Sequence, residues 1–431
     1  MLYSNISVNE LGHLTVAGHD AIEFTNKYGT ALMVLDEVRV RENCRVYSES
    51  IKEFFPEGSF AAYASKALCF RTLYKIIEEE GLGADAVSPG EIYTMSAAKF
   101  PLEKVFYHGN NKTCEDLAFA IYKKVGYIVV DNLDELYSLN TIASELNEKT
   151  NILLRLTPGI DPHTHAKIST GGIDSKFGTP IEGGQALALL GEALKLGNVT
   201  VKGFHCHIGS QIFECQPFLD AADIMLGFVK EVKDKLGFDT EIVNLGGGFA
   251  VKYVESDSEI DIRENLKVLG GYIKGKCADL GIAEPRIILE PGRSIVADAC
   301  TTLYKVGSIK VIPEHKNYVS VNGGMTDNPR YTLYGSSYTV INASRADGEK
   351  DFTCTLAGRC CESGDILQED IKIAKPVRGD IIAVLGTGAY NYSMASNYNR
   401  FCRPALIIVN GDEVRIGIRR ETFDSLIRND V

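Results

Sequence analysis

Lys66, in YASKA, follows directly after an apolar, β-rich run at Phe60–Ala64. A lysine in this place is either a solvated charge at the rim of a sheet or an amine held at the mouth of a site. Burial lowers the pKa of a lysine, and the neutral amine can then form a Schiff base with an aldehyde. A lone lysine is more often the solvated charge, so the role of Lys66 depends on its surroundings.

A second group of residues has the composition of a phosphate-binding site. Gly246, Gly247 and Gly248 follow an apolar run and could turn their backbone N–H groups toward a phosphate. A glycine triplet alone is at least as often a plain turn. Arg293 in EPGRS could add a fixed positive charge for a phosphate or a carboxylate, and Ser210 in HIGSQ could donate a hydroxyl. Together these residues predict a phosphate cradle.

Glu290 ends another strand-like run, where a carboxylate that faces the interior needs a cationic partner. A protonated pyridine nitrogen is such a partner, and the cationic ring can accept the electrons released when a substituent leaves Cα as CO₂. The alternative is a surface ion pair between Glu290 and Arg293. Combined with Lys66 and the phosphate cradle, Glu290 predicts pyridoxal phosphate as the cofactor.

His205 and His207 alternate along a strand and face the same way, a spacing that suits a metal. No third ligand with convincing spacing is evident in the sequence, and we therefore predict no metal. We expect His205 to be a core histidine and His207 to lie flat against an aromatic cofactor. His163 and His165, in DPHTH, are expected in a loop near the mouth of the site.

The C-terminal part of the chain holds three segments dense in polar or reactive groups, NPRYTLY, AGRCCESGD and GTGAYNYSMASNYN. A plain β domain would alternate apolar and polar residues instead. Cys361, Glu362 and Tyr390 are the main functional candidates in these segments. The alternatives are inert thiols at Cys360 and Cys361, and a packed aromatic near a glycine turn at Tyr390.

These residues need a scaffold that brings distant segments together, and the sequence repeats a suitable unit. From about residue 58 to 292, short apolar runs alternate with polar or glycine loops and helical stretches with apolar residues at 3–4 spacing. Eight such units predict a (β/α)₈ barrel with its active site at the C-terminal ends of the strands, rather than an open doubly wound sheet. The predicted strands are Phe60–Ala64, Ala84–Ser88, Val105–His108, Ile128–Asp131, Ile152–Leu156, Val201–His205, Ile242–Leu245 and Arg286–Glu290.

After Ser294 the pattern changes to strand-like runs broken by Gly, Asn and Asp, with little helix. This change predicts a second, all-β domain. The segment before the first barrel strand is also loop-rich and of short period. We therefore assign residues 28–295 to the barrel, and residues 1–27 and 296–431 to a β domain that contributes to the active site of a dimer.

Composition limits the remaining possibilities. A chain of 431 residues, 45% hydrophobic and 24% charged, predicts two globular domains. Its net charge of −12 argues against nucleic acids and anionic membranes as partners. The sequence has no membrane-length apolar run and no signal-like N-terminus, and its eleven cysteines lack CxxC pairs. We expect a cytoplasmic protein without a membrane segment, acting on a small molecule.

The motifs YASKA, HGNNK, DNLDEL, SKFG, HCHIGSQ, LGGGF, EPGRS, CESGD and GAYNYSMASNYN, in this order, resemble the diaminopimelate decarboxylase family. That family belongs to the fold-type III enzymes, with ornithine and arginine decarboxylases and alanine racemase. The resemblance covers nearly the whole chain. It implies decarboxylation of meso-2,6-diaminopimelate to L-lysine, the last step of lysine biosynthesis. The alternatives are decarboxylation of ornithine, arginine or lysine on the same scaffold, or a binding protein that has lost the cofactor.

The resemblance also implies a role for each candidate residue. Lys66 forms the Schiff base, His207 stacks on the cofactor ring, and Glu290 pairs with the pyridine nitrogen. Cys361 is the proton donor, delivered by the partner subunit of a head-to-tail homodimer. The phosphate contacts are Ser210, Gly246, Gly247, Gly248 and the backbone of Glu290, Pro291, Gly292 and Arg293. The substrate contacts are Arg293, Arg330, Tyr334, Glu362 and Tyr390, of which Tyr390 also touches the cofactor.

Three segments depart from the family pattern. SPGE replaces the commoner SGGE, Asn328 and Pro329 precede Arg330 where apolar residues are usual, and Arg359 and Cys360 precede Cys361. None of these changes removes a catalytic group. Lys66, Glu290 and Cys361 together argue against a protein that has lost the cofactor, because such a protein has no chemical need for all three.

Overall fold

A computed structural model describes residues 1–160 and 175–431. The chain divides into two compact units. We call Asn43–Ala250 with Glu259–Ser294 the barrel unit, and Met1–Glu42, Val251–Ser258 and Ile295–Val431 the sheet unit. The barrel unit thus begins at Asn43, later than the predicted residue 28, because strand β4 (Leu32–Asp36) pairs with strands β14 and β20 of the sheet unit.

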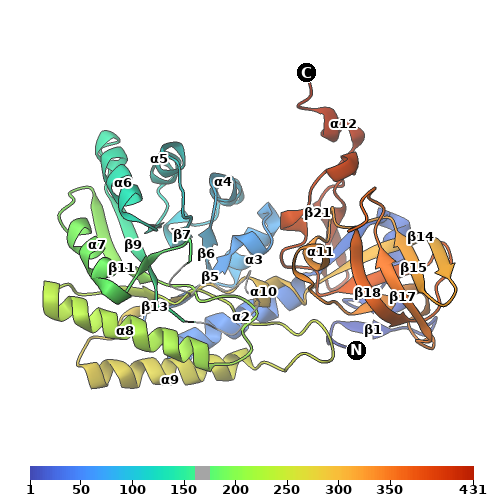
Figure 1. The fold of residues 1–431 in the computed structure, drawn as a ribbon, viewed down its shortest axis with the longest axis horizontal. Helices are drawn as coiled ribbons and strands as arrows, with labels where there is room; N and C mark the ends of the chain where they lie inside the picture. The colour runs from blue at the N-terminus through green and yellow to red at the C-terminus, as the bar shows by residue number, and fades with distance from the viewer. Residues whose placement is uncertain (161–174) are drawn as a thin grey trace. The chain divides into compact units, whose positions relative to one another are not determined.

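Eight parallel strands form the barrel (Figure 1). Each strand pairs with its neighbour, and the ring closes because β13 pairs with β5 and β8 pairs with β9. This confirms the predicted barrel. Its strands are β5 (Phe60–Ala64), β6 (Gly83–Ala86), β7 (Val105–Tyr107), β8 (Tyr127–Val130), β9 (Thr150–Thr157), β11 (Val199–His205), β12 (Ile242–Asn244) and β13 (Arg286–Leu289), and the short β10 (Thr179–Pro180) adds to β9.

An apolar plug fills the interior of the barrel. Phe106 stacks on Tyr127 with ring centroids 4.7 Å apart. Phe106 packs in one cluster with Ala62, Val129, Leu153, Ile242 and Ile288, and these six residues come from six different strands. Each large buried side chain of this kind contributes about 1.5–3 kcal/mol relative to an exposed one. Phe60 and Tyr127 begin their strands and pack against this cluster, which leaves the opposite strand ends for polar side chains.

Helices follow the barrel strands and surround them in Figure 1. Polar N-caps start several of them: Ser88 Oγ accepts a hydrogen bond from Glu91 N, and Asn132 Oδ1 accepts one from Glu135 N. These caps stand just after strands, where the turn from strand to helix must be tight. The helices that follow a barrel strand are α3 (Arg71–Glu79), α4 (Pro89–Ala98), α5 (Cys114–Tyr122), α6 (Leu133–Glu145), α7 (Gln185–Ala193), α8 (Gln216–Leu236) and α9 (Ile262–Leu280), with 3-10 turns η1 (Ser65–Ala67), η2 (Leu102–Lys104) and η3 (Glu182–Gly184). Helix α2 (Glu37–Phe54) precedes the first barrel strand, β5.

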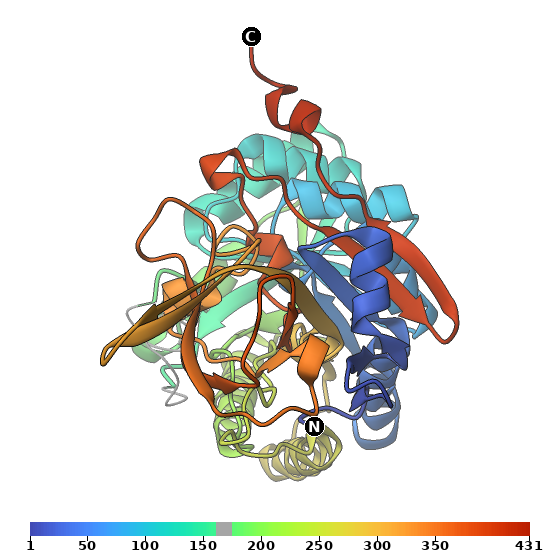
Figure 2. The same ribbon diagram turned by 90° about the vertical axis from the view of Figure 1, so that its right-hand side faces the viewer.

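The sheet unit contains a nine-stranded sheet and a small three-stranded one. Figure 2 shows the N-terminal segment, in blue, beside the orange and red strands of this unit. The large sheet holds β4, β14 (Cys300–Ile312), β15 (Lys316–Val321), β16 (Val340–Asn342), β17 (Phe352–Ala357), β18 (Ile366–Ile373), β19 (Ile381–Leu385), β20 (Ala405–Asn410) and β21 (Glu413–Ile418). The small sheet holds β1 (Ile6–Val8), β2 (Leu14–Val16) and β3 (His19–Asp20).

One core joins the N-terminal segment to the C-terminal strands. It contains buried residues such as Leu14, Leu32, Leu303 and Ile407. The short helices α1 (Ala21–Tyr28), α10 (Arg293–Val296), α11 (Arg330–Tyr334) and α12 (Phe423–Ile427) and the turns η4 (Ala343–Arg345), η5 (Tyr392–Met394) and η6 (Tyr398–Arg400) complete the elements.

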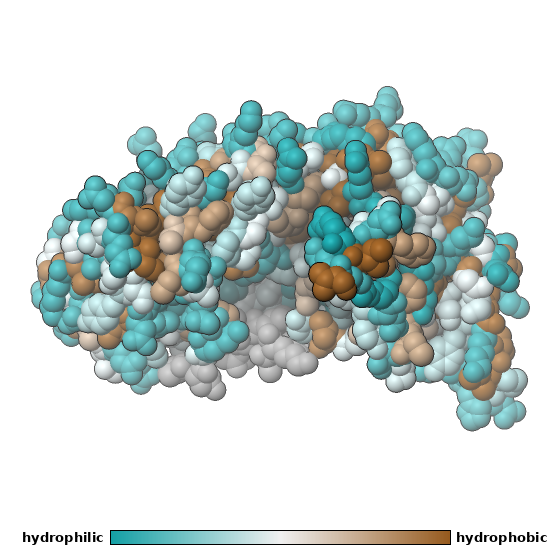
Figure 3. All heavy atoms as spheres, turned by 90° about the horizontal axis from the view of Figure 1, so that it is seen from above, coloured by the Kyte–Doolittle hydropathy of each residue, from teal (hydrophilic) through white to brown (hydrophobic). Residues whose placement is uncertain are grey.

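Charged and polar residues cover most of the face shown in Figure 3, and hydrophobic residues there form small patches. Over the described ranges, no helix has the length and apolar character needed to span a membrane.

Candidate active site

Lys66 lies in the turn η1, directly after strand β5, and is half-buried. Its neighbours fix the backbone of this turn: Ser65 Oγ donates to Asp85 O at 2.5 Å, and the Tyr63 hydroxyl donates to Leu68 O at 2.8 Å. The Lys66 charge acts on nearby groups, since burial and then Lys66 hold the pKa of His207 well below its ordinary value. The predicted amine therefore lies at the C-terminal ends of the barrel strands.

Glu290 lies just after strand β13 and is buried. Its Oε1 accepts a hydrogen bond from Asn244 Nδ2 at 2.7 Å and lies 2.8 Å from His108 Nε2. Its Oε2 lies 3.2 Å from His205 Nε2. Burial alone would raise the pKa of Glu290, but the two histidines outweigh burial and hold that pKa well below its ordinary value. The result is an ionised carboxylate inside the barrel mouth, as a pyridinium partner requires.

His205 can act as a hydrogen-bond donor to Glu290. Burial lowers the pKa of His205 to about 3, so its ring is neutral and its Nε2–H can donate to the carboxylate. The sequence predicted a core histidine here, and His205 is indeed buried.

Gly246, Gly247 and Gly248 form a loop that only glycine can occupy. An added Cβ would lie 2.7 Å from Cys206 O at Gly246, 2.0 Å from Glu290 O at Gly247 and 2.5 Å from Gly209 O at Gly248. Gly246 also has a left-handed φ of +69°. A loop without side chains lets a ligand approach the backbone closely, as an anion cradle requires.

Arg293 adds a buried guanidinium to the residues that are predicted to bind phosphate. Arg293 is 4% exposed, and its Nη2 donates to Ser210 Oγ at 2.9 Å. The structure therefore brings this predicted pair into contact. His207 lies against the same loop, because Gly247 N donates to His207 Nδ1 at 3.4 Å. An accepting Nδ1 agrees with the neutral ring expected from the lowered pKa of His207.

Sequence reasoning assigned no role to several residues that the barrel brings to this site. His108 and Asn244 contact Glu290, although only the motifs around them were noted. Asp85 is buried, its Oδ1 has no hydrogen-bond partner among the described residues, and burial raises its pKa to about 6. His108 and Asn244 stand at the C-terminal ends of predicted strands, which is the signal that could have found them, whereas Asp85 lies within the predicted strand Ala84–Ser88.

His108, His205 and Glu290 also have the composition of a metal site. All three are buried, and their ligand atoms lie within 4.8 Å of one another. Sequence spacing did not predict this group, because the three residues are far apart in the chain and His207 is not among them. Since Asn244 also donates to Glu290, we interpret the group as a carboxylate held by donors. The absence of a metal stays a prediction.

Three of the predicted substrate contacts gather in the sheet unit. The Arg330 guanidinium lies 5.1 Å from the centre of the Tyr334 ring and 5.4 Å from that of Tyr390. Arg330 is 6% exposed, its Nη2 donates to Ser336 Oγ at 3.3 Å, and its Nε has no hydrogen-bond partner among the described residues. Aromatic rings on the flanks and a free N–H in the plane are the surroundings in which arginine binds a carboxylate.

The CESGD segment forms an exposed loop with a fixed backbone. Asp365 accepts hydrogen bonds from Cys360 N at 2.7 Å and Met325 N at 2.6 Å, while Asn399 Oδ1 accepts from Cys361 N at 2.7 Å. Burial raises the pKa of the Cys360 thiol to about 12, which marks it as an inert thiol. Cys361 and Glu362 are exposed on the chain.

The predicted site residues thus fall into two groups. The barrel unit holds Lys66, His207, Ser210, Gly246, Gly247, Gly248, Glu290, Pro291, Gly292 and Arg293, and the sheet unit holds Arg330, Tyr334, Cys361, Glu362 and Tyr390. His163 and His165 lie outside the described residues.

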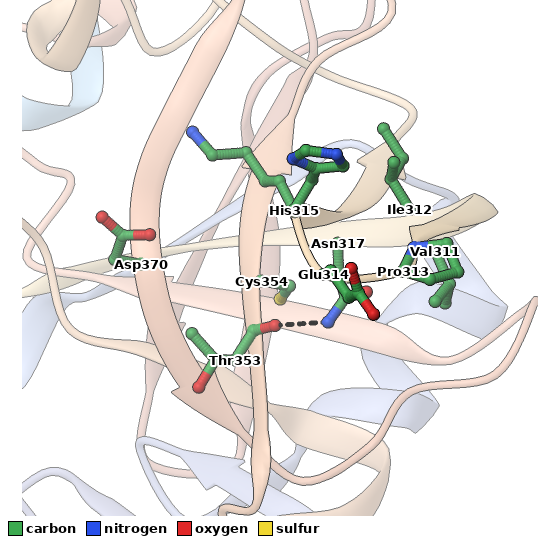
Figure 4. Close-up of a pocket in the computed structure, with 10 residues that line it drawn as sticks. Val311, Ile312, Pro313, Glu314, His315, Asn317, Thr353, Cys354 and Asp370 are labelled. Atoms are coloured by element: carbon green, nitrogen blue, oxygen red, sulfur yellow. Dashed lines mark hydrogen bonds between the residues drawn. The ribbon is translucent and has the colours of Figure 1, made fainter.

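A groove in the sheet unit lies apart from these residues, between the β14–β15 turn and strand β17 (Figure 4). Asn317 Nδ2 donates to Thr353 O at 2.9 Å across it. None of the predicted site residues lines this groove, and we assign it no role in the reaction.

The barrel unit carries the groups that pyridoxal phosphate requires: an amine, a glycine-rich phosphate cradle and a buried ionised carboxylate. Residues 39–297 match the model of a protein family described as "Pyridoxal-dependent decarboxylase, pyridoxal binding domain". Fold and site together therefore define a decarboxylase that depends on pyridoxal phosphate.

Similarity to known proteins narrows this class to one family. The chain is 45% identical to the diaminopimelate decarboxylase of Bacillus methanolicus over 97% of each chain. The crystal structure of diaminopimelate decarboxylase from M. jannaschii is 34% identical with a TM-score of 0.93, and the match covers 99% of this chain and 98% of that one. A co-complex of the M. jannaschii enzyme with L-lysine gives 35% identity and a TM-score of 0.92 at the same coverage. The chain belongs to the diaminopimelate decarboxylase family, as its motifs predicted.

Proposed function

We propose that this protein decarboxylates meso-2,6-diaminopimelate to L-lysine and CO₂, the last step of lysine biosynthesis. The family supports the reaction, and L-lysine bound to a relative that is 35% identical supports the product. The observation that carries the choice of substrate is the buried Arg330 guanidinium, whose Nε has no partner among the described residues. A buried N–H of this kind fits the distal carboxylate that diaminopimelate has and that lysine, ornithine and arginine lack.

The barrel unit fits pyridoxal phosphate at both ends of the cofactor. Lys66 would hold it through its amine and Glu290 through its pyridine nitrogen. The phosphate would lie against the backbone of Gly246, Gly247 and Gly248, the Ser210 hydroxyl and the backbone from Glu290 to Arg293. When bound, the cofactor supplies a cationic ring that takes up the electron pair of the breaking Cα–carboxylate bond.

Side chains of this protein would provide orientation and exclude water. A neutral His207 can lie flat against the ring without adding a competing charge. Arg330, which lies near the rings of Tyr334 and Tyr390, would bind the distal carboxylate of the substrate. The Glu362 carboxylate would accept hydrogen bonds from the distal ammonium. Two anchored ends hold the Cα–carboxylate bond in one orientation, which is a condition for its cleavage.

Cys361 is the proposed proton donor. After CO₂ leaves, Cα takes the proton of the Cys361 thiol, and the thiolate recovers a proton from solvent. The neighbouring Cys360 is poorly suited to this step, because burial raises the pKa of its thiol to about 12. We propose that Cys361 acts on the site of a partner subunit in a head-to-tail homodimer, which its exposure on the single chain supports.

We further propose that the enzyme works in the cytoplasm on a small molecule. All eleven cysteines are free thiols, which supports a reducing compartment. A net charge of −12 gives no support for a nucleic-acid partner.

The substrate assignment is tested by CO₂ release from meso-diaminopimelate, lysine, ornithine and arginine. Lysine, ornithine and arginine have no distal carboxylate, so binding any of them would leave the Arg330 guanidinium without its partner, at a cost of roughly 2–5 kcal/mol. At ~1.4 kcal/mol per factor of ten, wild type should prefer diaminopimelate by about 30-fold or more. Arg330→Ala should lose most of this preference. If wild type prefers another substrate, or if Arg330→Ala turns over diaminopimelate unchanged, the substrate assignment fails.

A further inference from the structure

Asn244, the last residue of strand β12, is fully buried and uses both ends of its amide. Its Nδ2 donates to Glu290 Oε1 at 2.7 Å, and its Oδ1 accepts from Gly246 N at 2.9 Å. Glu290 N in turn donates to Gly246 O at 2.8 Å. These three hydrogen bonds form a closed ring that joins Asn244, Gly246 and Glu290.

The ring links two parts of the site with different tasks. Glu290 is the carboxylate proposed for the pyridine nitrogen, and Gly246 opens the loop proposed for the phosphate. We propose that Asn244 is a positioning residue that sets the Glu290 carboxylate and the glycine loop in a fixed relation, matched to the two ends of pyridoxal phosphate. This inference rests on the proposed roles of Glu290 and of Gly246, Gly247 and Gly248.

The chemistry of the two partners allows one orientation of the amide. An ionised carboxylate can only accept, and a backbone N–H can only donate, so the Asn244 NH₂ must face Glu290 and its oxygen must face Gly246. Strand register supports this placement, because Asn244 pairs with His205 on one side and with Ile288 on the other. His205 also contacts Glu290, at 3.2 Å, so neighbouring strands hold the same carboxylate from two directions.

Substitutions at position 244 distinguish the two hydrogen bonds of the Asn244 amide, one to Glu290 and one from Gly246. Asn244→Leu keeps a similar volume and removes both. Asn244→Asp keeps an acceptor for Gly246 N but places a second carboxyl group against Glu290, where two such groups share one proton and weaken the full negative charge. Among side chains of this length, only that of Asn can both donate to the Glu290 carboxylate and accept from Gly246 N.

The test is the affinity of the apoenzyme for pyridoxal phosphate and for inorganic phosphate, together with the absorption spectrum of the bound cofactor. Asn244→Leu should raise the Kd for pyridoxal phosphate by about tenfold or more, equivalent to ~1.4 kcal/mol. It should also weaken the binding of inorganic phosphate. Asn244→Asp should change the spectrum and the pyridoxal phosphate affinity while it retains phosphate affinity. The double variant with Asn244→Leu and Glu290→Gln should lose less binding free energy for pyridoxal phosphate than the two single variants lose in sum, because the two residues act as a unit.

The outcomes separate this inference from the proposed function. If Glu290→Gln binds pyridoxal phosphate with wild-type affinity and spectrum, the proposed cofactor site fails and the inference fails with it. If Glu290→Gln weakens pyridoxal phosphate binding or changes the spectrum while Asn244→Leu and Asn244→Asp match wild type, the inference alone is overturned. A lower Tm of the Asn244 apoenzymes with unchanged affinities and spectra would show a purely structural role, and would also overturn it.

Discussion

At the scale of single residues, surroundings distinguish a reactive lysine from a structural one. Lys112 in HGNNK is buried like a candidate, but its amine is fully occupied: it lies 2.8 Å from Glu135 and donates to Gly109 O at 2.7 Å and Val129 O at 2.9 Å. Lys66 instead stands half-buried at a strand end beside the groups that fit pyridoxal phosphate. The two lysines therefore make a matched pair for a chemical test.

Borohydride reduction of the holoenzyme should attach the pyridoxyl group to Lys66. Peptide mass mapping measures the position of the adduct. Lys112→Met is the control variant and should still form the adduct at Lys66, whereas Lys66→Ala should form none. An adduct on Lys112, or on any lysine other than Lys66, would contradict the assignment.

The sequence identified the groups that do chemistry better than the groups that hold them. Glu290, Arg293 and Ser210 have side chains whose reactivity or charge is visible in a motif. Asn244 and His108 matter only through contacts with Glu290, and nothing in the residue type of either shows which distant side chain it meets. Such contacts become visible once the order of the strands in the barrel is known.

At the scale of elements, the eight barrel strands could be predicted because each is a short apolar run bounded by turn residues. Strand β4 (Leu32–Asp36) shows where that reasoning ends. Its sequence is as apolar as that of a barrel strand, and all five residues are buried, yet it pairs with β14 and β20 of the sheet unit. Local pattern predicts that a strand forms, whereas its partners are set by side-chain packing across the whole chain.

The CESGD loop gives a prediction at this scale. Asp365 is 3% exposed and accepts from Met325 N and Cys360 N, and Gly324 and Gly358 leave room for its carboxylate. Asp365→Ala would leave two N–H groups without acceptors, at a cost of about 1–3 kcal/mol each if they stay buried. We expect a lower Tm and a lower kcat, because the backbone before Cys361 is released.

Thermal unfolding and CO₂ release from meso-diaminopimelate measure the two effects. Asp365→Asn keeps one acceptor oxygen and should lie between wild type and Asp365→Ala. Asp412→Ala changes an exposed aspartate of the same unit and should match wild type in both measurements. Wild-type Tm and kcat for Asp365→Ala would show that the loop does not depend on this carboxylate.

At the scale of the whole molecule, the proposed chemistry is divided between two compact units. Lys66 and the cofactor contacts belong to the barrel unit, and Cys361 and Arg330 belong to the sheet unit. The sequence indicated this division through the change of pattern after Ser294. It could not show which subunit supplies Cys361, because that depends on an interface between two copies of the chain.

The central claim is that one site decarboxylates meso-diaminopimelate with Lys66 from one subunit and Cys361 from the other. Lys66→Ala and Cys361→Ala should each form almost no L-lysine alone. After subunit exchange at equal amounts, half of the dimers are mixed and each holds one intact site, so L-lysine formation should return to about one quarter of wild type. L-lysine formation that stays at the level of the separate variants, with exchange confirmed by native mass spectrometry, would contradict the account.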